Sequence, residues 1–174
     1  MDRTRFYEIL DGAREGVEDD APSADADDLR TALEALDDDE LLGFARRFDD
    51  ELALLNRWSV REAGYVVAGG MSDDGFRAFR AWLIGKGSAA VDAVLADPED
   101  LADLLTSGEP LENEALASAA LEAADERGLQ DPESEEGAAT PDGEPEGEPF
   151  DPEGSDGFDP GPRYGSPARR GACS

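Results

Sequence analysis

The stretch that decides the fold lies at the centre of the chain, where residues 72–84 read Ser72-Asp73-Asp74-Gly75-Phe76-Arg77-Ala78-Phe79-Arg80-Ala81-Trp82-Leu83-Ile84. Ser72 can cap a helix, and the two aspartates after it suit the positive end of the helix dipole. Phe76, Phe79 and Leu83 recur at steps of three and four residues, which places them on one helix face. Gly85 can end the helix. The pattern predicts an amphipathic helix with a well-developed apolar side.

The same spacing recurs on both sides of this stretch. We expect further helices over about 2–15, after a cap at Ser23 or Asp25, from Asp37–Asp39 through Leu55, over 60–68 up to Gly69-Gly70, around 91–95, after Pro98, and over about 111–127. No segment alternates apolar and polar residues as a half-buried strand does. Residues 1–129 are therefore predicted to form a single compact all-α domain of six to eight helices.

The composition changes near residue 130. Residues 130–174 hold 8 of the 11 prolines, 8 glycines and 12 acidic residues against 3 basic ones. Gly-Glu-Pro occurs at 143–145 and 147–149, and Phe-Asp-Pro at 150–152 and 158–160. The Phe-Asp-Pro copies are either docking motifs or ordinary recurrence in a low-complexity sequence. Such a segment buries too little apolar surface to fold, so we expect a disordered acidic tail.

The 174-residue composition excludes several classes of protein. The chain has no histidine, one cysteine and a formal charge of −29, so we expect no metal site, no cofactor and no histidine-based catalysis. Direct nucleic-acid binding is not expected, because it depends on basic residues that neutralise phosphates. The N-terminus carries no signal-peptide pattern and no run is long enough to span a bilayer, which predicts a cytoplasmic, monomeric protein without a membrane partner.

Charge is distributed unevenly within the domain. Residues 46–86 carry seven basic and six acidic residues, whereas the rest of 1–129 carries a net −21. The same window contains both tryptophans. The candidate interaction patch in this window consists of Arg57, Trp58, Arg61, Tyr65, Ser72, Asp73, Asp74, Arg77, Arg80 and Trp82. Either these arginines pair with local acids inside the fold, as Asp73 and Arg77 can at i,i+4, or they form a surface that receives an acidic peptide, a carboxylate or a phosphate.

Three classes of function remain open at this point. The first is a protein-interaction or regulatory module that uses the central patch to dock an unknown protein partner. The second is an acidic decoy that occupies nucleic-acid-binding proteins through its carboxylates. The third, least favoured, is an enzyme that uses a pair of carboxylates. The sequence singles out no catalytic, cofactor-binding or metal-binding residue.

Residues 63–84 also resemble a known family. The run Ala63-Gly64-Tyr65, followed by Gly69-Gly70-Met71-Ser72-Asp73-Asp74-Gly75-Phe76 and then Phe79-Arg80-Ala81-Trp82-Leu83-Ile84, is similar to the signature of the bacterial family DUF 4240. Phe44-Ala45, Phe48-Asp49-Asp50 and Ala96-Asp97-Pro98 extend the resemblance, which covers about 2–128. It implies a small, mostly helical domain without an established activity. Met71 departs from the small residue or cysteine expected there, and the tail lies outside the resemblance.

Overall fold

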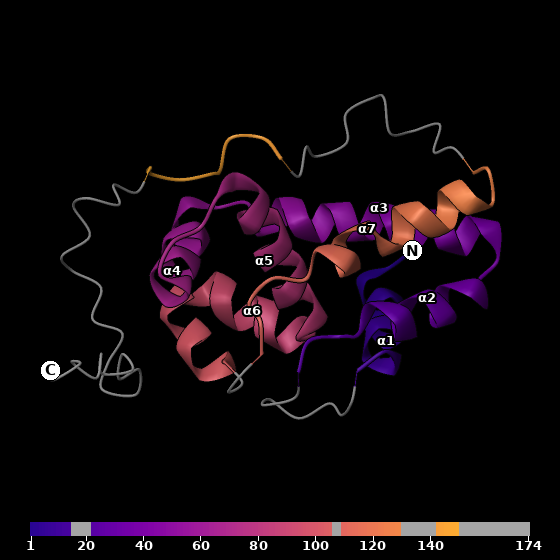
Figure 1. The fold of residues 1–174 in the computed structure, drawn as a ribbon, viewed down its shortest axis with the longest axis horizontal. Helices are drawn as coiled ribbons and strands as arrows, with labels where there is room; N and C mark the ends of the chain where they lie inside the picture. The colour runs from indigo at the N-terminus through magenta and orange to yellow at the C-terminus, as the bar shows by residue number, and fades with distance from the viewer. Residues whose placement is uncertain (15–21, 106–108, 130–141, 150–174) are drawn as a thin grey trace, which may run out of the picture.

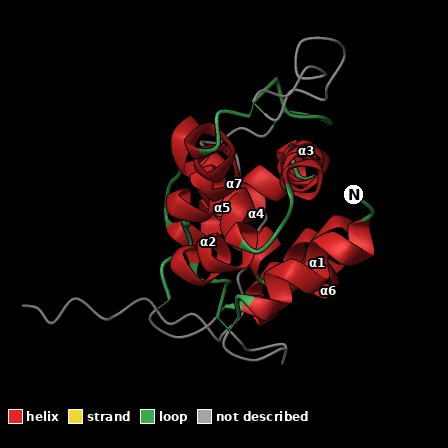
Figure 2. Ribbon diagram, turned by 90° about the vertical axis from the view of Figure 1, so that its right-hand side faces the viewer, coloured by secondary structure: helices red, strands yellow, loops and turns green. Residues whose placement is uncertain are grey.

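The computed structural model describes residues 1–14, 22–105, 109–129 and 142–149. Over these residues the chain forms α1 (Arg3–Gly12), α2 (Ala26–Glu34), α3 (Asp38–Leu54), α4 (Trp58–Ala68), α5 (Asp73–Gly85), α6 (Ser88–Ala96), the 3-10 helix η1 (Pro98–Leu104) and α7 (Glu114–Glu126). Figures 1 and 2 show helices joined by loops, with no strand in the described ranges. The predicted all-α class and the range of six to eight helices are confirmed.

The helix starts follow the predicted caps. The side chain of Asp25 accepts from the backbone N–H groups of Asp27 and Asp28, so Asp25 rather than Ser23 caps α2. Asp37 and Ser72 cap α3 and α5 in the same way. Gly69 adopts a left-handed conformation with φ 72° at the end of α4, a geometry that glycine adopts without the steric penalty of a side chain. Pro98 does begin a helix, but that helix is 3-10 rather than α.

Helix α5 forms the centre of the core. Ten of its 13 residues are buried, including Phe76, Phe79 and Leu83. The ring of Phe79 stacks on Trp82 at 5.7 Å and on Phe76 at 6.5 Å. Because most of α5 is buried, other helices cover it from several directions. Helix α7 covers one side and also packs against α2 and α3 (Figures 1 and 2).

The residues that precede α2 and α7 fix the position of α5 by hydrogen bonds. The N–H of Ala24 donates to the carbonyl of Gly85 at 2.9 Å, and the N–H of Asn113 donates to that of Ala78 at 2.9 Å. The amide of Asn113 also donates to the carbonyl of Ala24 at 3.1 Å. These bonds tie the starts of α2 and α7 to the same stretch of α5.

One buried carboxylate connects α1 with α3. Glu51 is 2% exposed and accepts from Arg3 Nε at 2.8 Å and from the Tyr7 hydroxyl at 2.8 Å. Arg3 also pairs with Asp92 on α6 at 2.8 Å. Burial, with the neighbouring charge of Glu51, raises the pKa of the Tyr7 hydroxyl above its usual value. The network satisfies Glu51 and therefore has a structural role.

Eight residues of the tail, 142–149, are described, and residues 142–146 lie against the helical domain. The segment turns at residues 142–143, bends again at residues 147–148 and runs near the starts of α4 and α5 (Figure 1, orange). Its contacts are with the loop between α3 and α4 and with α5. The remaining tail residues, and the Phe-Asp-Pro copies with them, lie outside the described residues.

We expect Gly85→Ala to lower the free energy of unfolding by about 1–3 kcal/mol, because the added methyl overfills a packed site. A Cβ there would lie 2.8 Å from Leu116 Cδ2 and 3.0 Å from the backbone nitrogen of Ala24, and would also meet the Ser23 hydroxyl. Gly12→Ala is the matched control, since its Cβ would meet nothing within 4 Å. Urea unfolding followed by circular dichroism measures both. Equal stability of the two variants would contradict this account of the α5 junction.

Candidate functional site

A recess of about 500 Å³ lies where the end of α3, the start of α4 and the first turns of α5 meet. We call it the arginine recess. It is lined by Asn56, Trp58, Arg61, Asp73, Asp74, Phe76, Arg77 and Arg80 of the domain, and by Asp142, Gly143, Glu144 and Pro145 of the tail segment. Three guanidinium groups thus converge on one concave surface of a strongly acidic protein.

Aromatic rings position two of these cations. The guanidinium of Arg61 lies over the rings of Trp58 at 5.4 Å and Phe76 at 5.5 Å. That of Arg80 lies over Phe76 at 4.6 Å. A guanidinium above an aromatic face is attracted by the negative charge of that face and loses little of its hydrogen-bonding capacity. Arg61 also pairs with the exposed Asp73 at the rim.

Arg80 is the buried cation of the recess. It is 2% exposed, and its Nη1 donates to the carbonyl of Leu52 at 2.7 Å. Leu52 lies in the last turn of α3, where helix carbonyls lack partners within the helix, so Arg80 satisfies a group that would otherwise be orphaned. Burial lowers the pKa of Arg80 to about 10; Asp142 acts against this shift, while the charges of Arg77 and Arg61 add to it. A negative charge placed here is therefore stabilising.

The tail segment supplies such a charge. Asp142 Oδ2 lies 2.7 Å from Arg77 Nη1, and Asp142 Oδ1 lies 3.5 Å from Arg80 Nη2. Arg77 and Arg80 are three residues apart on α5, so their side chains project from neighbouring positions on one helix face. The carboxylate of Asp142 bridges the two guanidinium groups.

The backbone of the tail segment pairs with the loop between α3 and α4. Glu146 donates its N–H to the carbonyl of Asn56 at 2.8 Å and accepts from the N–H of Trp58 at 3.0 Å. The Asn56 side chain donates to the carbonyl of Gly143 at 2.8 Å. Trp58 is the first residue of α4, and within the described part of the chain no side chain caps that helix. The carbonyl of Glu146 therefore satisfies a free N–H at the helix start.

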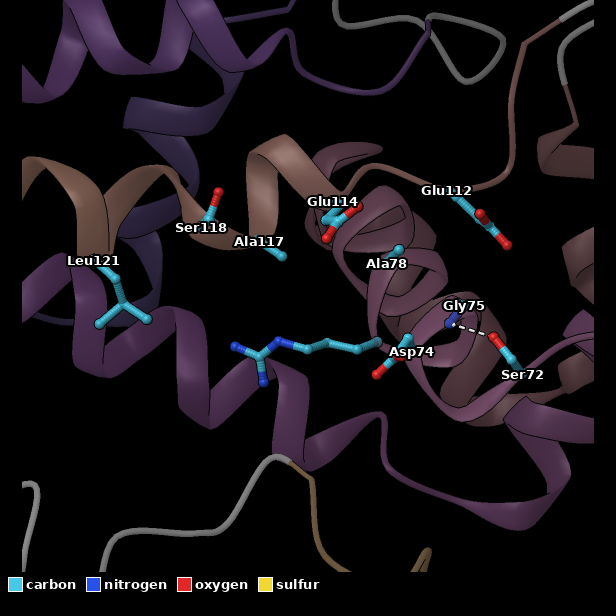
Figure 3. A pocket seen from close by; sticks show the side chains of 10 residues that line it. Ser72, Asp74, Gly75, Ala78, Glu112, Glu114, Ala117, Ser118 and Leu121 are labelled. Carbon is cyan, nitrogen blue, oxygen red and sulfur yellow. Dashed lines mark hydrogen bonds between the residues drawn. The ribbon is translucent and has the colours of Figure 1, made fainter.

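A second recess of about 480 Å³ lies on the other side of Arg77, between α5 and α7. Figure 3 shows its labelled lining: Ser72, whose hydroxyl accepts from the N–H of Gly75 at 3.0 Å, and Leu121 of α7 facing the same space. Leu121 is 52% exposed and so leaves an apolar side chain at this edge. Asp74 and Arg77 line both recesses.

The structure brings together six of the ten residues predicted for the patch, namely Trp58, Arg61, Asp73, Asp74, Arg77 and Arg80. Arg57 adjoins the recess through its backbone, which forms a bridge with Glu146, and Ser72 lines the second recess. Tyr65 lies farther along α4, and its carbonyl accepts from Gly70. Trp82 is 1% exposed and belongs to the core, because it lies on the buried side of α5.

Sequence reasoning missed Asn56 and the tail residues that line the recess. Asn56 lies in the loop after α3, and no residue near it in the sequence indicates a binding role. Residues 142–146 belong to the tail, which the sequence predicts to be disordered. Gly-Glu-Pro occurs at 143–145 and again at 147–149, so the sequence alone does not show which copy lies at the recess. Phe76 appeared in the sequence only as a core residue, although its ring also lies under two guanidinium groups.

We expect Arg80→Lys to lower the free energy of unfolding by about 1–3 kcal/mol, because lysine lacks the second arm needed to satisfy the Leu52 carbonyl while facing Asp142. Arg77→Lys is the control one turn away and should change stability by less than about 1 kcal/mol, as is usual for exposed ion pairs. Urea unfolding measures both. A loss at Arg80 no larger than that at Arg77 would contradict a stabilising bond between Arg80 and Leu52 of α3.

Comparison with known proteins adds a family but no activity. No curated protein and no solved structure matches the chain. None of the described helices is long and apolar enough to cross a membrane. The described residues also contain no cluster of three or more side chains suited to hold a metal ion. A family model described as "Protein of unknown function (DUF4240)" matches residues 1–126, which include every arginine of the recess, and the chain therefore belongs to the DUF4240 family.

Proposed function

We propose that this protein is an interaction module that binds an extended acidic segment of a partner protein in the arginine recess. The observation that carries the proposal is the carboxylate of Asp142, which lies between Arg77 and Arg80. Hydrogen bonds between a guanidinium and a carboxylate are stronger than neutral ones, so two neighbouring arginines select for an acidic side chain.

The backbone contacts support a peptide rather than a small anion as the ligand. Asn56 offers a carbonyl and a side-chain amide, and Trp58 offers an N–H, all toward the same edge of the recess. These groups match the donor and acceptor pattern of an extended chain. A free carboxylate or phosphate would use the arginines and leave these groups to water.

The surrounding charge disfavours a polyphosphate ligand. Asp73 and Asp74 stand at the rim, and the protein carries −29 overall. A nucleic-acid backbone would bring many phosphates against this acidic surface, whereas a short segment brings only a few charges into the recess. The decoy and the carboxylate enzyme stay hypotheses. The buried carboxylate of Glu51 gives the enzyme no support, because Arg3 and Tyr7 already engage it.

The test uses a fluorescein-labelled octapeptide with the sequence Asp-Gly-Glu-Pro-Glu-Gly-Glu-Pro and the full chain carrying Asp142→Lys, which vacates the recess. We expect fluorescence anisotropy to report saturable binding, weakened at least tenfold when Arg77→Gln is added. Arg5→Gln is the matched control: it makes the same charge change on α1, where Arg5 pairs only with Glu8 and Glu40 among the contacts described. If no binding is seen up to about 1 mM protein, or if the two arginine variants lose equal affinity for the octapeptide, the proposed interaction module is refuted.

A further inference from the structure

We propose that residues 142–149 act as an intramolecular ligand, which forms one wall of the arginine recess and pairs with its arginines until a partner segment of the same chemistry displaces it. The inference rests on the proposed function and adds its regulation. Under this proposal the isolated protein is in a closed state, and partner binding is a competition between two acidic segments for one site.

The segment contacts the domain as a bound peptide does. Asp142 supplies a side-chain anchor, whereas Gly143 and Glu146 use only their backbone groups. None of these contacts places a side chain of the segment in the hydrophobic core. Displacement of the segment therefore leaves the core intact and exposes the side chains of Arg77 and Arg80 together with the polar groups of Asn56 and Trp58.

The anchors are weak enough to exchange. The side chain of Asp142 is 62% exposed, and exposed ion pairs contribute about 0–1 kcal/mol. The segment is nevertheless present at high local concentration, because only residues 130–141 separate it from the described end of the domain. A connection of this length gives an effective concentration on the order of 1 mM. The ion pair and the backbone hydrogen bonds together fill the site at this concentration only if the dissociation constant of the free segment lies below about 1 mM, and a partner that binds more tightly then displaces the segment.

The segment also indicates what the partner must carry. A carboxylate has to meet Arg77 and Arg80, and four residues later an extended backbone has to pair with Asn56 and Trp58. The next residue in this chain, Gly147, has φ 105°, which turns the chain in a way that residues with a Cβ seldom adopt. We infer that the partner segment has an Asp or Glu, three intervening residues, one backbone-pairing residue and then a glycine.

The experiment compares three full-length proteins in binding the labelled octapeptide: the unmodified chain, Asp142→Lys and Glu148→Lys. Lysine at 142 places a cation against the three arginines and expels the segment. Lysine at 148 makes the same charge change at an exposed described residue that does not line the recess. We expect Asp142→Lys to bind the octapeptide about tenfold more tightly than the unmodified chain, and Glu148→Lys to bind it within twofold of the unmodified chain.

The outcomes separate the two proposals. If Asp142→Lys binds the octapeptide no more tightly than the unmodified chain, the segment does not compete and the regulatory inference is wrong, while the module stands. If Asp142→Lys does not bind at all, the module itself is refuted. If both lysine variants increase the affinity for the octapeptide equally, the cause is the added positive charge in general, and the inference is wrong.

Amide hydrogen exchange gives a second readout that needs no ligand. The N–H of Glu146 donates to Asn56 in the docked segment, so in the unmodified chain we expect this amide to exchange several-fold more slowly than in Asp142→Lys. An exchange rate equal to that of a free peptide in the unmodified chain would show that the recess is not occupied by its own tail.

Discussion

A guanidinium group buried at the meeting point of three segments constrains much of this structure. Arg80 projects from the central helix α5, lies over the ring of Phe76, donates to the last turn of α3 and faces the carboxylate of Asp142. Burying a cation is unfavourable unless its hydrogen bonds are satisfied, and the lowered pKa of Arg80 reflects that penalty. Arg80 thus holds α5 against α3, and it makes a negative charge at the neighbouring surface favourable.

The family match and the segment 142–149, which pairs with the recess arginines, lie in different parts of the chain. The family match ends at residue 126, before the segment 142–149 begins. Eight of the twelve residues that line the recess belong to the matched domain, in the loop before α4, in α4 and in α5, whereas the other four belong to the segment beyond the matched region. The cationic wall of the recess thus lies in the domain, which agrees with a site at which one acidic segment can replace another.

Much of the helical architecture could be predicted from local patterns. Asp25, Asp37 and Ser72 begin helices because their side chains satisfy free N–H groups, and Gly69 ends one because it adopts positive φ. The type of η1 was not predictable from Pro98 alone, since proline suits the first turn of either kind of helix. The candidate site was predicted less completely. Trp58 and Trp82 look alike as sequence, but one lies at the start of α4 beside the tail and the other inside the core.

The sequence by itself determined the helices, the balanced charge of residues 46–86 and the chemical nature of the site, because these depend on residue type and spacing along the chain. Only the tertiary structure decided which arginines share a recess, that Arg80 is buried within it, and that an acidic stretch beyond residue 129 lies against them. Those facts depend on helix crossings and on contacts between residues more than 60 positions apart, such as Arg77 and Asp142, and no local pattern encodes such distances.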